Sequence, residues 1–282
     1  MQRPLGSDGD APGQRRQWAL NRANFDGHWQ GPTRWYLRGP GGFDFQRPSL
    51  EIPQSTYAIS FSDADHGTWH GTGLRFAPGN ERILPLSRST YNSGGSCWQF
   101  PGAGGQSSLT MTSEAPRCGH EVNLFSGRSR SMLIALYAPL GDGAVQLESV
   151  AATPFRCQRG EIDPPRAPLA SAAELLERVA GWPGERQVLE PGLWPEACPA
   201  AEPIAGFEPV AFALHDHTTA FDDNLVCSLP DRLPAGAFQL QFGCLLQADH
   251  FAQVCLSFDA NHRLSRWELR RHRPAPAPRT SG

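Results

Sequence analysis

The sequence contains no lysine, because all 25 of its basic residues are arginine. This absence excludes Schiff-base catalysis, a lysine general base and the lysine of a phosphate-binding loop. The formal net charge is only -3, so no strong field recruits nucleic acid or an anionic membrane. The planar guanidinium of arginine binds both oxygens of a carboxylate, which slightly favours a carboxylated ligand, although codon usage in a GC-rich genome explains the same composition.

Pairs of cysteines are also missing. The seven cysteines are widely spread without a C-x-x-C pair, so the sequence contains neither a disulfide framework nor a zinc site. His215 and His217 form an H-x-H pair, but no third ligand follows at a suitable spacing, and Asp216, Asp222 and Asp223 make this region look like a polar turn. We therefore expect no metal.

Signals for export, membrane insertion and nucleophilic catalysis are absent as well. Residues 1–17 lack the apolar core of a signal peptide. The longest apolar run, residues 132–140, is far short of the ~20 residues needed to cross a bilayer. No G-x-S-x-G segment occurs, and residues 102–108, GAGGQSS, indicate a flexible loop rather than a phosphate cradle. We expect a cytoplasmic protein without a transmembrane segment.

The sequence does contain many short alternating segments separated by turn residues, among 29 glycines and 26 prolines. About nine such segments precede residue 157, enough strands to close one antiparallel barrel. They are residues 29–38, 57–61, 68–76, 82–86, 96–100, 108–113, 120–125, 132–137 and 145–153. The clearest alternation places Phe238, Leu240, Phe242, Cys244 and Leu246 on one face of a later strand. These patterns predict an all-β fold.

Changes in composition divide the chain into two barrel-like units. Three prolines break the strand pattern after residue 157, and Ser171 and Glu174 then form a capping box at the start of a short helix. Five more strands follow, at residues 207–214, 225–229, 237–246, 251–258 and 264–271. We expect a disordered tail (1–16), an N-terminal barrel (17–157), a proline-rich linker (158–206) with a helix at 171–180, a C-terminal antiparallel unit (207–273) and a second disordered tail (274–282).

A G-x-W-x-G motif occurs at residues 27–31 and again at residues 67–71. In lipocalin-type barrels a short helical turn precedes the first strand, and a G-x-W tryptophan closes the barrel floor. Residues 18–25 followed by Trp29 have this order. Arg266 or Arg270 of the last strand is then a candidate to stack on Trp29, unless the arginines of that strand form a solvated face.

Four segments carry a wider resemblance: NFDGHWQGPTRWY, FSDADHGTWHGTGLRFAPGNERILPL, SCWQFPGAGG and LSFDANHRLSRWEL. Together they make residues 18–273 similar to an uncharacterised cyanobacterial and plastid family of lipocalin-like (calycin) proteins. The resemblance implies an N-terminal and a C-terminal barrel-like unit. The same fold class includes the phycobiliprotein chromophore lyases, which deliver an open-chain tetrapyrrole to a cysteine of an apoprotein, but this chain contains no lyase-specific motif.

Aromatic and arginine side chains concentrate between residues 29 and 98 and form the predicted ligand site. Aromatic rings would form the walls of an apolar pocket, and inward-facing arginines would pair with an anionic head group. The candidates are Trp29, Arg34, Tyr57, Trp69, Arg75, Arg88, Tyr91 and Trp98. The alternative explanations stay open: the tryptophans as barrel-floor or strand-start residues, and the arginines as a solvated outer face.

We therefore expect the chain to bind a hydrophobic, carboxylated small molecule in a β-barrel. A bilin, a carotenoid-derived compound or a fatty acid would fit, and a bound bilin is the one cofactor considered. A pigment-binding protein is then a candidate partner. Two alternatives remain: a chromophore lyase or isomerase that transfers protons through Arg, His or Glu, and a structural protein whose barrel is filled by its own side chains. The sequence does not decide whether the chain is an enzyme.

Overall fold

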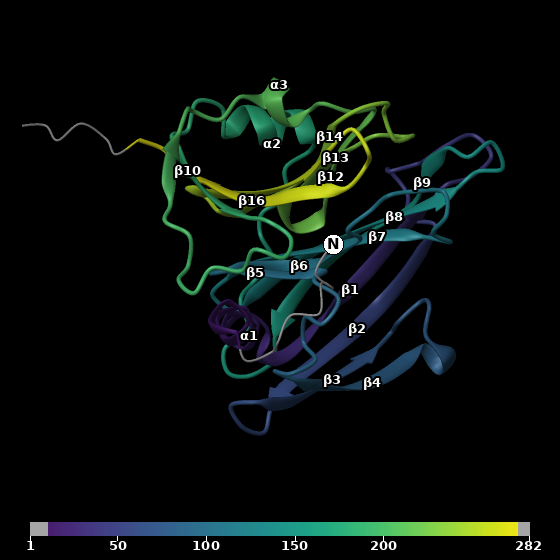
Figure 1. The fold of residues 1–282 in the computed structure, drawn as a ribbon. Helices are drawn as coiled ribbons and strands as arrows, with labels where there is room; N and C mark the ends of the chain where they lie inside the picture. The colour runs from purple at the N-terminus through teal and green to yellow at the C-terminus, as the bar shows by residue number, and fades with distance from the viewer. Residues whose placement is uncertain (1–10, 276–282) are drawn as a thin grey trace, which may run out of the picture.

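Antiparallel strands form two sheets in the computed structural model, which describes residues 11–275 (Figure 1). The first sheet has nine strands in the order β4-β3-β2-β1-β9-β8-β7-β6-β5. They are β1 (Gly27–Leu37), β2 (Leu50–Phe61), β3 (His66–Thr72), β4 (Glu81–Ser87), β5 (Cys97–Phe100), β6 (Ala103–Ser107), β7 (Cys118–Ser126), β8 (Ser129–Pro139) and β9 (Val145–Cys157). The predicted all-β class is confirmed.

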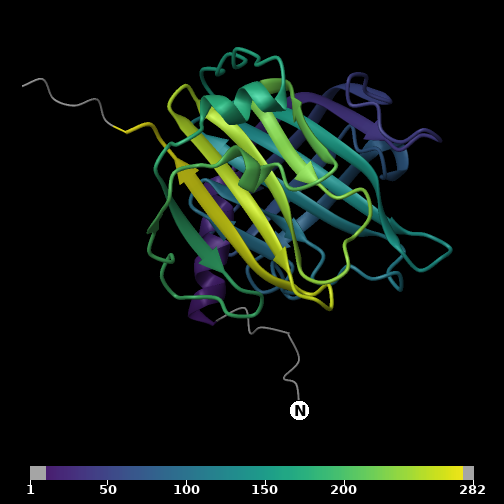
Figure 2. The same ribbon diagram turned by 90° about the horizontal axis from the view of Figure 1, so that it is seen from above.

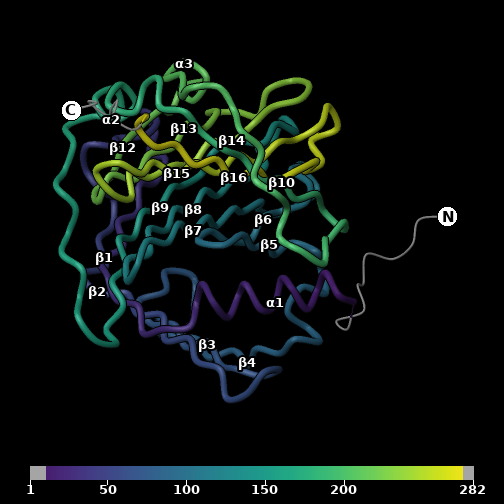
Figure 3. The backbone as a smooth tube through the Cα atoms, turned by 90° about the vertical axis from the view of Figure 1, so that its left-hand side faces the viewer, coloured from purple at the N-terminus to yellow at the C-terminus, as the bar shows by residue number. Residues whose placement is uncertain are grey.

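The first sheet curls into a half-barrel (Figures 1 and 3). Two meanders, β1 to β4 and β5 to β9, are joined because β1 pairs antiparallel with both β2 and β9. Strands β2, β3 and β4 bend away from the others, and helix α1 (Pro12–Phe25) lies in the opening between β3–β4 and β5–β6 (Figure 3). Because β4 and β5 remain edge strands, the sheet is a half-barrel rather than a closed barrel.

Helix α1 is docked onto edge strand β5 by two polar side chains. Gln17 and Asn24 are seven residues apart and therefore lie on one face of the helix, two turns apart. Gln17 accepts a hydrogen bond from the backbone N–H of Gln99 (2.7 Å) and donates one to the carbonyl of the same residue (3.1 Å). Asn24 bonds in the same way to the turn between β5 and β6. The side chain of Gln17 thus occupies the position that a neighbouring strand would take.

The second sheet has seven strands in the order β11-β10-β16-β15-β14-β13-β12. They are β10 (Gly184–Leu189), β11 (Glu202–Ile204), β12 (His217–Phe221), β13 (Leu225–Leu229), β14 (Phe238–Gln247), β15 (His250–Phe258) and β16 (Leu264–His272). Helices α2 (Ala172–Arg178) and α3 (Pro209–Phe212) lie over its outer face (Figures 1 and 2). The 3₁₀ turns η1 (Pro78–Asn80) and η2 (Asp222–Asn224) complete the described elements.

The two sheets pack on each other through one shared hydrophobic core. The residues predicted to alternate on one face of β14 all belong to it, which confirms that pattern; they are Phe238, Leu240, Phe242, Cys244 and Leu246. From opposite sheets, Trp98 and Trp267 both donate their indole N–H to the hydroxyl of Ser107, each at 3.1 Å. The two β units therefore form a sandwich around a common core.

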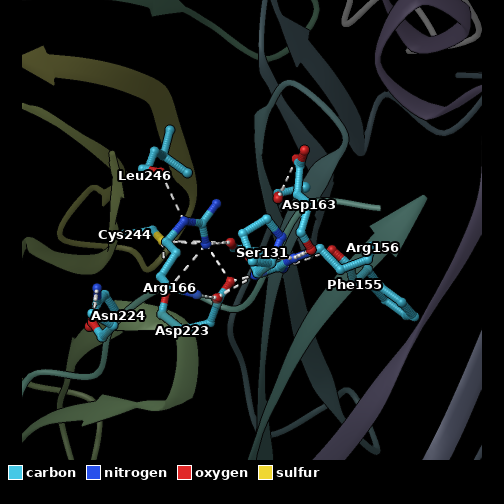
Figure 4. Close-up of polar contacts among 12 residues, drawn as sticks. Ser131, Phe155, Arg156, Asp163, Arg166, Asp223, Asn224, Cys244 and Leu246 are labelled. Atoms are coloured by element: carbon cyan, nitrogen blue, oxygen red, sulfur yellow. Dashed lines mark hydrogen bonds and ion pairs between the residues drawn. The ribbon is translucent and has the colours of Figure 1, made fainter. Parts of the chain in front are cut away.

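A buried ion network ties the segment after β9 to both sheets (Figure 4). The Asp223 carboxylate, only 3% exposed, accepts from Arg156 of β9 (Nη2–Oδ1, 2.5 Å) and from the backbone N–H of Arg166 (2.9 Å). The Arg166 guanidinium also donates to Ser131 of β8 (2.8 Å) and to the Leu246 carbonyl of β14 (2.8 Å). Buried charges need such pairing, so this network fixes where the chain crosses from one sheet to the other.

Two strand assignments in the first half differ from expectation. Residues 103–107 of the expected flexible loop form β6, which pairs with β7. Glycine is needed at this place because a Cβ atom on Gly105 would lie 1.9 Å from the carbonyl oxygen of Glu121. Residues 108–113, expected as a strand, form a loop that meets the second sheet at the Thr110–Arg263 bridge.

The second half contains strands that the sequence analysis missed. Residues 184–189 of the expected linker form β10 and pair with β16, and residues 217–221 of the expected polar turn form β12. Residues 207–214 form no strand, because Pro209 begins the α3 turn there. Helix α2 agrees with expectation, since Ser171 Oγ accepts from the Glu174 N–H (3.1 Å).

The expected tails fall partly outside the structure. Residues 12–16, expected to be disordered, belong to helix α1, where Pro12 suits the first helical turn. The remaining tail predictions for residues 1–10 and 276–282 lie outside the described residues.

Candidate functional site

The concave face of the half-barrel carries a cluster of aromatic side chains. Tyr57 of β2 lies between the two motif tryptophans: it pairs with Trp29 across β1 and β2, and its ring centroid lies 5.2 Å from that of Trp69. The Trp29 indole is buried and donates to the carbonyl of Phe25 at the end of α1 (2.8 Å). Burial raises the pKa of Tyr57, so its phenol stays protonated at neutral pH. Through the hydrogen bond between Trp29 and Phe25, the end of helix α1 is held at one end of the concave face.

Next to this cluster the concave face is hollow. A cavity of about 290 Å³ is bordered by residues of β1 to β4 and β8. Its apolar walls are Trp35, Tyr57, Trp69, Leu74, Phe76, Leu84, Met132, Ile134 and Leu136. This volume lies at the small end of the roughly 300–1,000 Å³ that ligand pockets occupy, and a largely apolar lining with few polar groups is typical of such pockets.

Arg75 brings a guanidinium group to this cavity. It follows β3 in the chain, and its Cζ atom lies 5.0 Å from the ring centroid of Trp35 and 4.6 Å from that of Phe76. Its Nη1 atom is buried and has no hydrogen-bond partner in the protein. Burial lowers the pKa of Arg75, with Glu148 acting in the opposite direction, but an arginine stays charged. A carboxylate oxygen of a ligand would supply the missing acceptor.

The remaining polar lining consists of hydroxyl groups and one rim arginine. Thr33 Oγ1 lies 2.7 Å from Ser55 Oγ and 2.8 Å from Thr153 Oγ1, and Thr33 and Ser55 border the cavity. Arg82 of β4 is exposed at the rim. Within the described residues, this lining includes no carboxylate, imidazole or thiol group. The lining therefore combines apolar walls with a few hydroxyl and guanidinium groups.

A second guanidinium, that of Arg130 on β8, is buried deeper in the concave face. Its side chain is 1% exposed, and its Nε donates to Asn123 Oδ1 (2.7 Å). Its Cζ atom lies 4.8, 5.0 and 4.9 Å from the ring centroids of Phe25, Tyr57 and Phe155, respectively. Met132 and Tyr57 both contact Arg130, and both line the cavity, so their side chains lie between Arg130 and the cavity. Arg130 holds the aromatic floor of the site together.

Three of the eight predicted ligand-binding residues, Tyr57, Trp69 and Arg75, meet at this cavity. Trp29 belongs to the adjoining aromatic cluster. Tyr91 lies against Trp18 of α1, with ring centroids 5.5 Å apart. Trp98 is fully buried in the core between the two sheets, away from the concave face.

The other predicted arginines lie elsewhere. Arg34 projects from the opposite face of β1, where it pairs with Glu51 (3.2 Å), and Arg88 pairs with Asp65 (2.7 Å). The alternative in which Arg266 or Arg270 stacks on Trp29 is wrong. Both arginines belong to the second sheet, where they flank Glu268, whereas Trp29 belongs to the first.

The histidine pair of the sequence has local partners. His215 Nε2 lies 2.6 Å from the Gln239 carbonyl, and His217 Nε2 lies 2.7 Å from Asp231 Oδ1. Among residues 11–275, no group of three or more His, Cys, Asp or Glu side chains could hold a metal ion. The seven cysteines are free thiols. In the same part of the chain, no helix combines the length and apolar character needed to span a membrane.

Several lining residues were missed by the sequence analysis, chiefly Trp35, Phe76 and Met132. Strand alternation offered a signal for one of them. Trp29, Thr33 and Trp35 share a face of β1, whereas Arg34 takes the other, so a ligand site built around Trp29 predicts Trp35 rather than Arg34.

The chain is an all-β protein in which one strongly curled sheet, the half-barrel, packs against a second sheet and borders a largely apolar cavity. In this fold the chain is similar to a protein of unknown function of the DUF3598 family from Nostoc punctiforme, with a TM-score of 0.64, 14% identity, and coverage of 92% of this chain and 99% of that one. A second match, to a putative outer membrane protein from Bacteroides fragilis, has 6% identity and a TM-score of 0.20, with coverage of 90% of this chain and 99% of that one. No protein-family model and no curated protein matches the sequence. The likeness to the Nostoc protein concerns the fold, and it fits the resemblance to an uncharacterised cyanobacterial family.

Proposed function

We propose that the chain binds a hydrophobic small molecule with a carboxylate head in the cavity of the half-barrel. The observation that carries this proposal is the Arg75 Nη1 atom, which is buried without a protein acceptor beside a largely apolar cavity. Burial of the ligand's apolar body would contribute roughly 25 cal/mol per Å² of area, and the guanidinium would orient its head.

The size of the cavity favours a small ligand. At about 290 Å³, it suits a fatty-acid-like chain or a carotenoid-derived fragment better than a complete open-chain tetrapyrrole. A binder is also better supported than a lyase or isomerase, because the described lining supplies guanidinium and hydroxyl groups but no general base. A bilin ligand would be revealed by a visible absorption band in protein purified from a pigmented host.

The proposal is tested with two ligands that differ only in the head group, dodecanoate and dodecanol. Binding is followed through the fluorescence of the tryptophans, since Trp35 and Trp69 line the cavity. We expect dodecanoate to bind more tightly, and Arg75→Met to weaken dodecanoate by about tenfold while leaving dodecanol unchanged.

Arg88→Met is the matched control, because it also removes one guanidinium but lies away from the cavity beside Asp65. It should leave both affinities unchanged. Equal binding of acid and alcohol by the unaltered protein, or equal effects of the two variants, would contradict a role for Arg75 in recognising a carboxylate.

A further inference from the structure

A second cavity, of about 280 Å³, lies on the outer face of the second sheet, turned away from the half-barrel. Its floor is formed by Gln253 of β15 and by Glu268, Arg270 and His272 of β16. Its roof is the segment 204–212, which includes α3 (Figure 1). This cavity shares no lining residue with the candidate site in the half-barrel.

Three buried polar atoms at this cavity lack a hydrogen-bond partner in the protein: Gln253 Oε1, Glu268 Oε2 and His272 Nε2. Their residues are 1%, 1% and 2% exposed. His272 Nδ1 lies 3.1 Å from the Trp182 carbonyl and must carry the proton, while burial lowers the pKa of the ring and keeps it neutral. Its Nε2 is therefore a lone-pair acceptor, like the two oxygens.

A chain of side-chain amides fixes the orientation of Gln253. Gln239 donates to Ser257 Oγ (3.2 Å), Gln241 donates to Gln239 Oε1 (3.1 Å), and Gln253 donates to Gln241 Oε1 (2.7 Å). The amide oxygens of Gln239 and Gln241 each accept a hydrogen bond within this chain, so the Oε1 atom of Gln253, at the cavity, is the amide oxygen left without a donor. The hydrogen bonds of the network therefore orient the Gln253 side chain so that its oxygen, an acceptor, lies at the cavity.

The charges around Glu268 limit which ligand can satisfy these acceptors. Arg270 donates to Glu268 Oε1, and Glu268 Oε2 lies 4.0 Å from Arg186 and 3.9 Å from Arg266. Three guanidinium groups thus surround one carboxylate, which disfavours an ammonium ligand. The lining also contains the Glu208 carboxylate, so its two guanidinium groups, Arg186 and Arg270, are balanced by two carboxylates and it does not select an anion either. A neutral hydroxyl group avoids both problems, because it donates to one neighbour and accepts from another.

We propose that this cavity binds a neutral polyhydroxylated small molecule, a monosaccharide or a cyclic polyol. Gln253 and Arg270 stand directly opposite each other across β15 and β16, so one hydroxyl can donate to the amide oxygen and accept from the guanidinium. A second hydroxyl donates to His272. The rings of Phe207 and Phe212 line the same cavity and offer an apolar surface to the C–H face of the ligand.

The test is an NMR titration of the ¹⁵N-labelled protein with D-glucose, D-galactose and myo-inositol, and with glycine and acetate as charged probes. We expect saturable shifts of the β15 and β16 amides with at least one neutral probe, at about millimolar concentration, and none with the charged probes. Gln253→Met should weaken binding by about fivefold or more, since it removes the free acceptor.

Gln239→Met is the matched control, because it removes the amide at the other end of the same chain and leaves Gln241 equally short of one partner. It should change the affinity by less than about twofold. Ala211→Phe, at an exposed position in the roof, should fill the cavity and abolish binding while the protein stays folded. The absence of saturable binding by all three neutral probes, binding of glycine or acetate in their place, or equal losses in Gln253→Met and Gln239→Met would overturn the proposal.

Discussion

Two arginines of the half-barrel illustrate two ways of accommodating a guanidinium in an apolar environment. Arg130 is enclosed by aromatic faces and hydrogen-bonded to Asn123, so most of its interactions are internal. Arg75 contacts two rings as well, and both arginines keep a buried Nη1 atom without a hydrogen-bond partner. They differ in position, because Arg75 borders the cavity and Arg130 does not.

Arg130→Met should therefore destabilise the protein. The substitution removes the buried cation, the donor to Asn123 Oδ1 and the ion pair with Glu121, so we expect the free energy of unfolding to fall by about 2–4 kcal/mol. Urea denaturation at neutral pH measures this change. Arg82→Met, at the exposed rim, should change stability by less than about 0.5 kcal/mol; similar losses in the two variants would show that Arg130 is not a structural anchor.

The residue types of the site were predictable from the sequence, but their grouping was only partly so. Tyr57, Trp69 and Arg75 come from neighbouring segments and meet at one cavity. Trp98 stands in an equally aromatic stretch, yet lies in the core between the sheets, because strand β5 turns that side chain toward the second sheet. Which face of a strand meets which sheet is a tertiary property, and local alternation does not contain it.

At the scale of elements, β6 shows how glycine can build a strand rather than break it. Gly105 allows its two neighbours, β5 and β7, to lie close to β6, because a side chain at this position would collide with the Glu121 carbonyl and with the Trp98 ring (2.9 Å). Trp98 can pack only because Gly105 leaves that space. This glycine is thus part of the core packing.

Gly105→Ala should consequently be strongly destabilising. The added methyl group must displace the β7 backbone, and we expect a loss of about 3 kcal/mol or more in the free energy of unfolding. Gly94→Ala is the control, since a Cβ atom there meets nothing within 4 Å; it should change stability by less than about 0.5 kcal/mol. Thermal and urea unfolding measure both variants, and a Gly105→Ala protein as stable as the control would refute the packing argument.

Strands with clean alternation, such as β14, were predictable because one of their faces lies in the core while the other carries polar groups. Strands β10 and β12 were not. Residues 184–189 and 217–221 are short and polar and follow prolines or aspartates, and they become strands because β16 and β13 offer them an edge. The partner of β10 is distant in the sequence, whereas β12 pairs with the next strand across the short η2 turn, and in neither case does the propensity of the strand itself describe the pairing.

In the molecule as a whole, the side chain of Asp231 connects the two sheets through hydrogen bonds to residues of both. It accepts hydrogen bonds from Arg38 and Gln146 (3.1 Å) on the side of the first sheet and lies 2.7 Å from His217 of the second. Burial alone would raise the pKa of Asp231, but the hydrogen bonds from His217 and Arg38 outweigh it and hold the pKa at about 2, below the ordinary 3.8.

This shift predicts an acid-sensitive contribution to stability. Because the folded carboxyl releases its proton more readily than the unfolded one, the contribution is complete above about pH 4 and is lost as the pH falls toward 2. We expect Asp231→Asn to lower the free energy of unfolding by about 1 kcal/mol at pH 6, and the difference from the unaltered protein to vanish near pH 2. Denaturation at several pH values measures it.

Asp142→Asn serves as the control, since both side chains of the ion pair between Asp142 and Arg232 are exposed to solvent. It should show little loss at any of these pH values. A difference between Asp231→Asn and the unaltered protein that does not depend on pH would argue against the carboxylate as the group that connects the two sheets.

The docking of α1 bears on how this protein behaves in a crowded solution. An open curled sheet has two rims that invite strands from other molecules, the first step toward fibrils. At one rim Gln17 pairs with the backbone N–H and carbonyl of Gln99 in β5, and at the other Pro85 removes an amide from β4. Detaching the helix would leave the Gln99 backbone groups without their partner and would expose the β5 edge to strands of other molecules.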